Sequence, residues 1–364
     1  MTITSGHRRK FLATSSLGLA AAATTKVYAS EPIPASCESA VAQQVLASSA
    51  SWDDGLAHPI PYANPPGQGK RKGLALGGGG LILLAWYVGF FTALKDEGVD
   101  LDDADIVVGT SAGSLFGAML TSGKLWRMRD EMDLFAEFPK MLGMLLAPNA
   151  KNPSQTRAND LALTAKDASP WTIQSIGHAA AAARNDPDGS QLPGMVEKFI
   201  GMTQWASPRL YTTSNDCYTG QRLVVSHESG IPMNVACAAS GSLPGGLGPT
   251  FLHDRICMDG GICQTSTHSD VIGGVKKAII LSLGHGTPAD VTQGLRTSSL
   301  PNIMLDEIER LQANGTQTKL VAVGLVPGIK HLRSIMDPAL IGPYLEYGRQ
   351  RGQEQAEEIR AFWG

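Results

Sequence analysis

The chain has 364 residues, 43% of them hydrophobic and 17% charged, which is the composition of a folded protein and excludes a largely disordered one. The formal net charge is −3, and without residues 1–29, which hold four basic residues and no acidic one, 26 basic residues stand against 33 acidic ones. Such an acidic surface has no affinity for a phosphate backbone, so we expect no nucleic acid as a partner. The 41 glycines favour a mixed fold with many tight turns over a helical bundle.

The first segment of the chain has the features of an export signal. Arg8 and Arg9 precede a weakly apolar stretch rich in Ala and Ser, and residues 27–29 resemble a cleavage pattern. We expect a twin-arginine-type signal peptide over 1–29, which places the mature protein in the periplasm, the cell envelope or the medium. The alternative is a basic tail on a cytoplasmic protein. Residues 30–69 are rich in Pro, Ala and Ser without a period, which predicts a linker or a loosely packed arm.

The next segment begins a pattern of alternating strands and helices. No charged residue occurs from Gly73 to Leu94, yet the four consecutive glycines at 77–80 argue against a membrane span, and we expect none in the mature chain. The pattern predicts a buried strand over 73–76, a glycine turn, a helix over 81–97, a strand over 106–108 and a helix over 112–121. This order predicts an α/β fold with a mainly parallel central sheet flanked by helices.

The rest of the chain divides into a helical part and a second β-rich part. Residues 125–205 are predicted to be largely helical, and their methionine-rich start suits either ordinary core helices or an adaptable lid over an apolar substrate. After residue 208 the pattern predicts strands again, with helices over about 301–313 and 337–362. We therefore expect one domain over 70–364 that carries a helical insertion.

The five cysteines form no C-x-x-C pair, so no zinc site is predicted, and we expect neither a metal nor a cofactor. A disulfide between Cys257 and Cys263 and buried free thiols remain equal alternatives.

Ser111 is the candidate nucleophile. It lies in the pentapeptide Gly109-Thr110-Ser111-Ala112-Gly113, between a predicted strand and a predicted helix. A G-x-S-x-G turn in that context exposes the serine hydroxyl beside the N–H groups of a helix N-terminus. A serine hydroxyl still needs a base to take its proton and donors to stabilise the oxyanion.

Two further stretches supply candidates for these roles. Gly78, Gly79 and Gly80 offer main-chain N–H groups at the start of a helix, and the stretch fits neither a dinucleotide fingerprint nor a P-loop. Asp259, followed by Gly260 and Gly261, is a carboxylate in a tight turn that another loop can approach closely.

The order of a glycine-rich loop, G-x-S-x-G and Asp-Gly-Gly resembles the patatin-like phospholipase family, and the similarity extends over about residues 72–364. The resemblance implies a three-layer patatin-like fold and an acyl-ester hydrolase that acts on lipids, of the phospholipase A or carboxylesterase type, at a membrane surface. It implies Ser111 as nucleophile and Asp259 as base in a dyad without histidine, with an acyl-enzyme intermediate. The N–H groups of residues 78–80 would then form the oxyanion hole.

The sequence departs from the family at Ile82 and Leu83, where the usual loop has a basic residue and a glycine. Reduced or lost activity is therefore an alternative, and with it a non-catalytic, exported lipid-binding protein. A second alternative is a histidine-dependent serine hydrolase in which His268 or His285 is the base.

Overall fold

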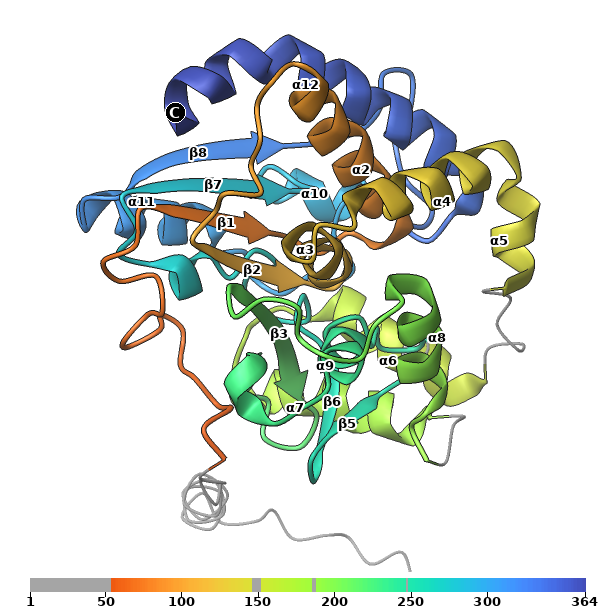
Figure 1. Ribbon diagram of the computed structural model, residues 1–364. Helices are drawn as coiled ribbons and strands as arrows, with labels where there is room; N and C mark the ends of the chain where they lie inside the picture. Colours follow the sequence, from red (N-terminus) through yellow and green to blue (C-terminus); the bar gives the residue numbers. More distant parts are fainter. Residues whose placement is uncertain (1–53, 146–151, 185–187, 247) are drawn as a thin grey trace, which may run out of the picture. The chain divides into compact units, whose positions relative to one another are not determined.

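The structure is a computed structural model that describes residues 54–145, 152–184, 188–246 and 248–364, with side chains omitted at 143–145. The expected signal peptide, 1–29, and Cys37 lie outside the described residues. The described part is built around one mixed sheet of eight strands with helices on both faces (Figure 1). The predicted α/β class is therefore confirmed.

Five strands form the parallel part of the sheet, in the order β3-β2-β1-β7-β8, and three further strands extend it in antiparallel pairings. The parallel strands are β1 (Lys72–Leu76), β2 (Ile106–Thr110), β3 (Leu210–Asp216), β7 (Lys277–Ser282) and β8 (Gln317–Ala322). The antiparallel strands are β4 (Arg222–Val225) and β6 (Arg255–Asp259), which both pair with β3, and β5 (Thr250–Leu252), which pairs with β6.

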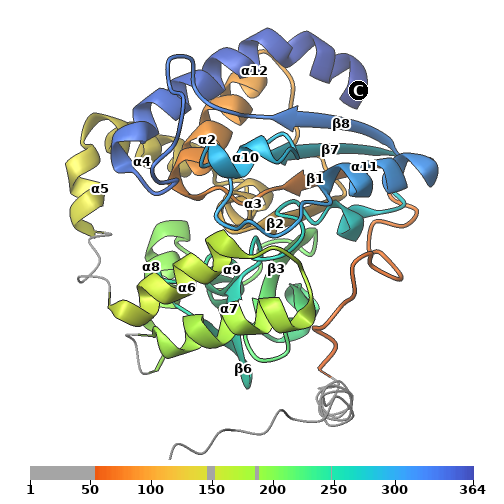
Figure 2. The ribbon, with the colours of Figure 1, turned by 180° about the vertical axis from the view of Figure 1, so that it is seen from behind.

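The parallel strands are apolar on both faces because helices cover both. On β1, Leu74 and Leu76 join one hydrophobic core while Ala75 between them joins the other, since successive strand side chains point to opposite faces. The first core packs under α2 (Gly80–Asp96), α3 (Ala112–Thr121), α4 (Leu125–Glu137) and α12 (Ile341–Trp363). The second packs under α11 (Met304–Ala313), which lies on the opposite face (Figures 1 and 2).

The predicted helical region contains α4 and four more helices: α5 (Pro139–Leu145), α6 (Pro153–Thr164), α7 (Pro170–Ala182) and α8 (Gln191–Ile200). Two short helices follow, α9 (Met233–Ser240) and α10 (Ala289–Thr292), with 3-10 turns at His227–Ser229, Ser269–Ile272 and Pro338–Leu340. The helices predicted to begin at about 301 and 337 begin a few residues later, at Met304 in α11 and at Ile341 in α12. Asn302 Oδ1 accepts from the N–H of Met304, and Asp337 caps a 3-10 turn, so these residues form turns that lead into the helices.

The C-terminal helix is held against α2 by close backbone contact. A Cβ on Gly352 would lie 2.7 Å from the Phe90 carbonyl oxygen, and Cβ atoms on Gly348 or Gly89 would overlap the backbone of the facing helix. Small residues at these positions therefore let the two helices approach closely, and α12 covers α2 along its length (Figure 1).

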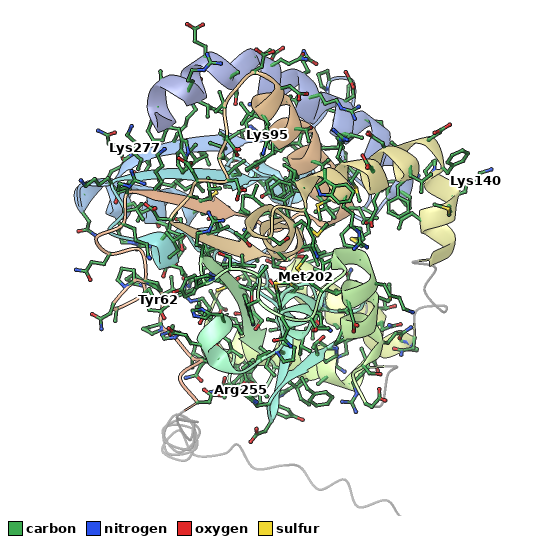
Figure 3. The ribbon with its side chains drawn as sticks, viewed as in Figure 1. Tyr62, Lys95, Lys140, Met202, Arg255 and Lys277 are labelled. Carbon is green, nitrogen blue, oxygen red and sulfur yellow. The ribbon has the colours of Figure 1, made fainter. Side chains whose placement is uncertain are left out.

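Residues 54–69, expected to belong to a linker or loosely packed arm, are packed against the domain. Leu56 is 1% exposed, and Asp54 pairs with Arg255 at 2.5 Å. The Tyr62 N–H donates to Asp270, and Arg222 binds main-chain carbonyls of the arm. Figure 3 shows Tyr62 in the arm and Arg255 near the point where the described arm begins. One ion pair, several hydrogen bonds and a buried leucine anchor a segment whose composition alone predicts a linker.

The described cysteines, Cys217, Cys237, Cys257 and Cys263, are buried free thiols, so the 257–263 disulfide is not formed. Among the described residues no helix combines the length and the apolar character needed to span a bilayer.

Candidate active site

The site forms where two strands meet end to end along one edge of β3. The last residue of β2, Thr110, pairs with Thr213, and the last residue of β6, Asp259, pairs with the next residue, Ser214. Because β4 occupies the other edge at these positions, β2 and β6 share one edge and approach it from opposite directions. The hydroxyls of Thr110 and Thr213 are 2.7 Å apart and join the strands at this point. The residues that follow the two strand ends are therefore brought together.

Ser111 forms a sharp turn between β2 and α3. Its φ is 51° and its ψ −117°, a left-handed conformation that side-chain-bearing residues rarely adopt. The turn is possible because the flanking backbones touch: a Cβ on Gly109 would lie 2.5 Å from the Gly113 carbonyl oxygen, and one on Gly113 would overlap the end of β1. Ala112 opens α3, so the serine hydroxyl lies at the N-terminus of that helix.

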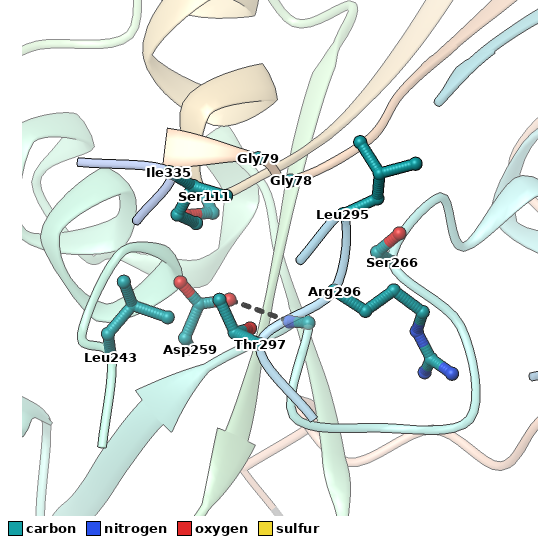
Figure 4. A pocket seen from close by; sticks show the side chains of 11 residues that line it. Gly78, Gly79, Ser111, Leu243, Asp259, Ser266, Leu295, Arg296, Thr297 and Ile335 are labelled. Carbon is teal, nitrogen blue, oxygen red and sulfur yellow. Dashed lines mark hydrogen bonds between the residues drawn. The ribbon is translucent and has the colours of Figure 1, made fainter. Parts of the chain in front are cut away.

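Asp259 presents one free carboxylate oxygen to Ser111. Its Oδ1 accepts the Gly261 N–H at 2.7 Å, whereas its buried Oδ2 has no hydrogen-bond partner among the described residues. Figure 4 shows the carboxyl and the Ser111 hydroxyl facing each other in one pocket. Burial raises the pKa of Asp259 from 3.8 to about 6, and the Gly261 N–H and the Ser111 hydroxyl oppose that rise. The two side chains lie close without a formed hydrogen bond, which is common before a substrate is bound.

The turn that carries Asp259 is fixed from behind by side chains of other elements. Asn215 Nδ2, on β3, donates to the carbonyl oxygens of Asp259, Gly260 and Ile262 at 2.8, 3.3 and 3.0 Å. His268 Nε2 also lies 2.9 Å from the Gly260 oxygen. Gly260 must be a glycine because a Cβ there would lie 2.5 Å from the Thr213 oxygen.

Gly78 and Gly79 of the glycine loop line the pocket, whereas Gly80 does not. The Gly78 N–H donates to the Ser266 carbonyl at 3.1 Å, so it holds the loop in place and is not free for an oxyanion. The N–H groups of Gly79 and Gly80 donate to no atom of the described residues, as expected at the first turn of α2. Of the three amides expected to form an oxyanion hole, Gly79 and Gly80 therefore remain as the available donors.

Ile82 and Leu83, the two departures from the family pattern, are fully buried and do not line the pocket. Leu83 packs beneath the loop, where a Cβ on Gly79 would lie 2.7 Å from its Cβ and Cδ2 atoms. Its side chain therefore crowds the loop from the core side, and Gly79 accommodates it because it has no side chain.

The pocket around Ser111 is small. Its cavity volume is about 20 Å³, room for about one water molecule. Its lining includes the apolar side chains of Leu243, Leu295 and Ile335, and the polar side chains of Ser266, Arg296 and Thr297 in addition to those of Ser111 and Asp259 (Figure 4). No described residue of the 125–205 insertion lines this pocket.

Neither candidate histidine lies in the pocket. His268 is buried behind the Asp259 turn, where burial and Arg222 lower its pKa to about 4. The His285 side chain is 54% exposed, and its Nδ1 lies 3.9 Å from Asp290. Among the described residues, no group of three or more His, Cys, Asp or Glu is placed to hold a metal ion.

The geometry coincides with a family match. Residues 74–271, more than half of the chain, match the family model for patatin-like phospholipases. The chain belongs to this family. The match begins in β1 and ends in the 3-10 turn after the Asp259 turn, so the glycine loop, the Ser111 turn and Asp259 all lie within the part that the patatin-like family shares.

Solved structures give weaker similarities, and no curated protein sequence matches the chain. The type III effector ExoU has 16% identity and a TM-score of 0.34, with 84% of this chain and 56% of that chain covered. VipD from Legionella pneumophila has 13% identity and a TM-score of 0.37, with 79% and 67% covered. ExoU in complex with SpcU, from Pseudomonas aeruginosa, has 19% identity and a TM-score of 0.34, with 82% and 52% covered. The chain thus spans little more than half of the length of ExoU.

Several residues of the site were not predicted from the sequence. Ser240, Asn215 and Ser266 contact its loops from distant parts of the chain, and Arg296 and Thr297 line the pocket. Nothing in the sequence of residues 238–246 indicates which hydroxyl reaches Ser111.

Proposed function

We propose that the protein is a serine acyl-ester hydrolase that acts on lipids, of the phospholipase A or carboxylesterase type. Ser111 is the nucleophile, Asp259 is the base, and the N–H groups of Gly79 and Gly80 are the oxyanion donors. The observation that carries the proposal is the buried Asp259 Oδ2, which has no partner among the described residues and faces the Ser111 hydroxyl. An unpaired buried carboxylate oxygen is costly, and a catalytic role explains why one is retained.

In the first half of the reaction, Ser111 Oγ attacks the carbonyl carbon of the ester while Asp259 Oδ2 takes the hydroxyl proton. The carbonyl oxygen becomes an oxyanion that the two glycine amides stabilise. Collapse of the tetrahedral intermediate breaks the bond to the alcohol, and Asp259 gives its proton to the leaving alkoxide. An acyl group then remains on Ser111.

Water completes the cycle. Asp259 takes a proton from the water as its oxygen attacks the acyl carbon, and the proton passes to Ser111 Oγ when the acid is released. The enzyme returns to its starting state.

The raised pKa of Asp259 fits this role, because a carboxylate of ordinary pKa is a weak base. The base must be ionised, so we expect kcat/KM to fall with an apparent pKa near 6 as the pH is lowered. The histidine-based alternative lacks support from the geometry, since neither His268 nor His285 lines the pocket.

The membrane is the proposed location of the substrate, and an acyl chain that reaches Ser111 would contact Leu243, Leu295 or Ile335 in the pocket. We also propose export through the twin-arginine-type segment. Replacement of Arg8 and Arg9 by lysine should leave the full-length chain in the cytoplasmic fraction, and unchanged export of this variant would refute the proposal.

The function is tested with a fluorophosphonate probe and with p-nitrophenyl esters of four to sixteen carbons. Covalent labelling of the wild type that is lost in Ser111→Ala, together with hydrolysis that falls by about 10²–10⁴-fold in Asp259→Asn, is expected. A folded wild type that neither labels nor hydrolyses any ester would support the lipid-binding alternative. Retained activity in Asp259→Asn would contradict the dyad.

A further inference from the structure

The main chain of the nucleophile, Ser111, is hydrogen-bonded to a residue outside the pocket. Ser240, the last residue of α9, is fully buried, and its Oγ accepts the main-chain N–H of Ser111 at 2.8 Å. Ser240 is not among the residues that line the pocket, so its hydroxyl acts on Ser111 from behind.

The N–H of Ser111 needs such an acceptor. Ser111 has a left-handed conformation, which turns its backbone out of the line of β2. A buried N–H group without a hydrogen-bond acceptor costs about 1–3 kcal/mol. A strained residue persists only where its surroundings fix it. The Ser240 hydroxyl supplies one of these fixed points at the residue that carries the nucleophile.

The same short segment also binds the backbone of the base. The carbonyl oxygen of Ser240 accepts the N–H of Gly260 at 3.4 Å, and the carbonyl oxygen of Ser242 accepts the N–H of Asp259 at 2.8 Å. The end of α9 is therefore hydrogen-bonded to the turn of Ser111 and to the turn of Asp259. These two residues are 148 positions apart in the sequence.

We propose that Ser240 is a positioning residue for acyl transfer, which sets the distance between Ser111 Oγ and Asp259 by holding the N–H of Ser111 with its side chain and the Gly260 N–H with its main chain. The proposal rests on the proposed function. Ser240 touches neither substrate nor the reacting atoms. Its loss lets the Ser111 turn relax, and a displacement of about 1 Å at a reacting atom costs about a hundredfold in rate.

The test compares Ser240→Ala, which removes only the accepting oxygen, with Thr212→Val. Thr212 is also a fully buried hydroxyl residue near the site, on β3, but its Oγ1 has no partner among the described residues. For Ser240→Ala we expect kcat to fall by about 10- to 100-fold with KM within a factor of two, and the fluorophosphonate labelling rate of Ser111 to fall in parallel. Thr212→Val should keep wild-type values. Rates are expressed per folded molecule, with the folded fraction measured by circular dichroism.

A purely structural role for Ser240 would lower the melting temperature without changing the rate per folded molecule, and that result would overturn the proposal. If Ser240→Ala does not fold, Ser240→Cys is the second variant, because a thiol of similar size is only a weak acceptor. An unchanged kcat in folded Ser240→Cys would likewise contradict the proposal, and a selective loss of kcat would support it.

Hydrogen exchange separates this proposal from the proposed function. Exchange in a peptide that spans residues 105–116 does not depend on turnover, and it should become faster in Ser240→Ala than in Thr212→Val. A wild type that fails to label with the probe would remove the hydrolase, whereas unchanged exchange in Ser240→Ala would remove the Ser240 contact.

Discussion

We expect the burial of the Asp259 carboxyl to affect the free energy of unfolding as well as catalysis. In the folded protein its pKa is about 6, against 3.8 in an unfolded chain, so the folded state holds its proton more tightly. Between these two values the unfolded state ionises first, and the stability of the wild type therefore falls as the pH rises from about 4 to 6. Above about pH 6 the ionisation of Asp259 lowers the stability no further. A difference of about two pKa units corresponds to about 3 kcal/mol.

Asp259→Asn removes this loss because the side chain keeps its shape and carries no charge. The amide oxygen can still accept the Gly261 N–H, and the amide nitrogen takes the position of Oδ2 opposite Ser111. We expect the variant to be inactive yet more stable than the wild type, by about 3 kcal/mol at pH 8 and about 1 kcal/mol at pH 4.5. Urea unfolding of Ser111→Ala, and of the variant that combines Ser111→Ala with Asp259→Asn, is measured at both pH values. The comparison shows whether Asp259→Asn also raises the free energy of unfolding when the nucleophile is absent.

The control is Asp167→Asn, since hydrogen bonds from Ser169 and Thr172 lower the pKa of that exposed carboxyl to about 2. Its replacement should bring no stabilisation at pH 8. The reasoning is wrong if Asp259→Asn is no more stable than the wild type at pH 8, or if the gain is as large at pH 4.5.

Three further substitutions test the arrangement of the site. Gly79→Ala places a Cβ 2.7 Å from Leu83 and should displace the glycine loop, with a loss of about 10²–10³-fold in kcat; wild-type kcat would contradict the displacement expected from this contact. Asn215→Leu removes the donor to three carbonyls of the Asp259 turn and should lower the free energy of unfolding by about 1–3 kcal/mol in urea titrations, a result that unchanged stability would contradict. Leu295→Ala widens the pocket and should raise kcat/KM for long-chain relative to short-chain esters, whereas an unchanged ratio would mean that acyl chains take another path.

The sequence predicted the elements around the nucleophile to within about two residues. The helix expected over 112–121 is α3, and the strand over 73–76 is most of β1. These elements are read from local periodicity, and their ends are marked by glycines whose conformations the turns require. The arm at 54–69 was predicted less well, because its anchoring depends on Arg222, Asp270 and Arg255, which lie far along the chain.

The division of the glycine amides also needed the structure. Gly78, Gly79 and Gly80 are equivalent in the sequence, but Ser266 approaches only the first of them and takes its N–H. The same holds for Leu83, whose effect on the loop depends on whether it points to the pocket or to the core.

By itself the sequence determined the chemical types: a serine in a strand-to-helix turn, a carboxylate in a glycine turn and a row of main-chain donors. Each is a contiguous motif whose geometry follows from its own residues. Only the tertiary structure decided that the ends of β2 and β6 meet on one edge of β3, and that Ser240 and Asn215 hold the two turns there. Those contacts join residues 44 to 129 positions apart, and no local pattern records which pairs the packing of the sheet will bring together.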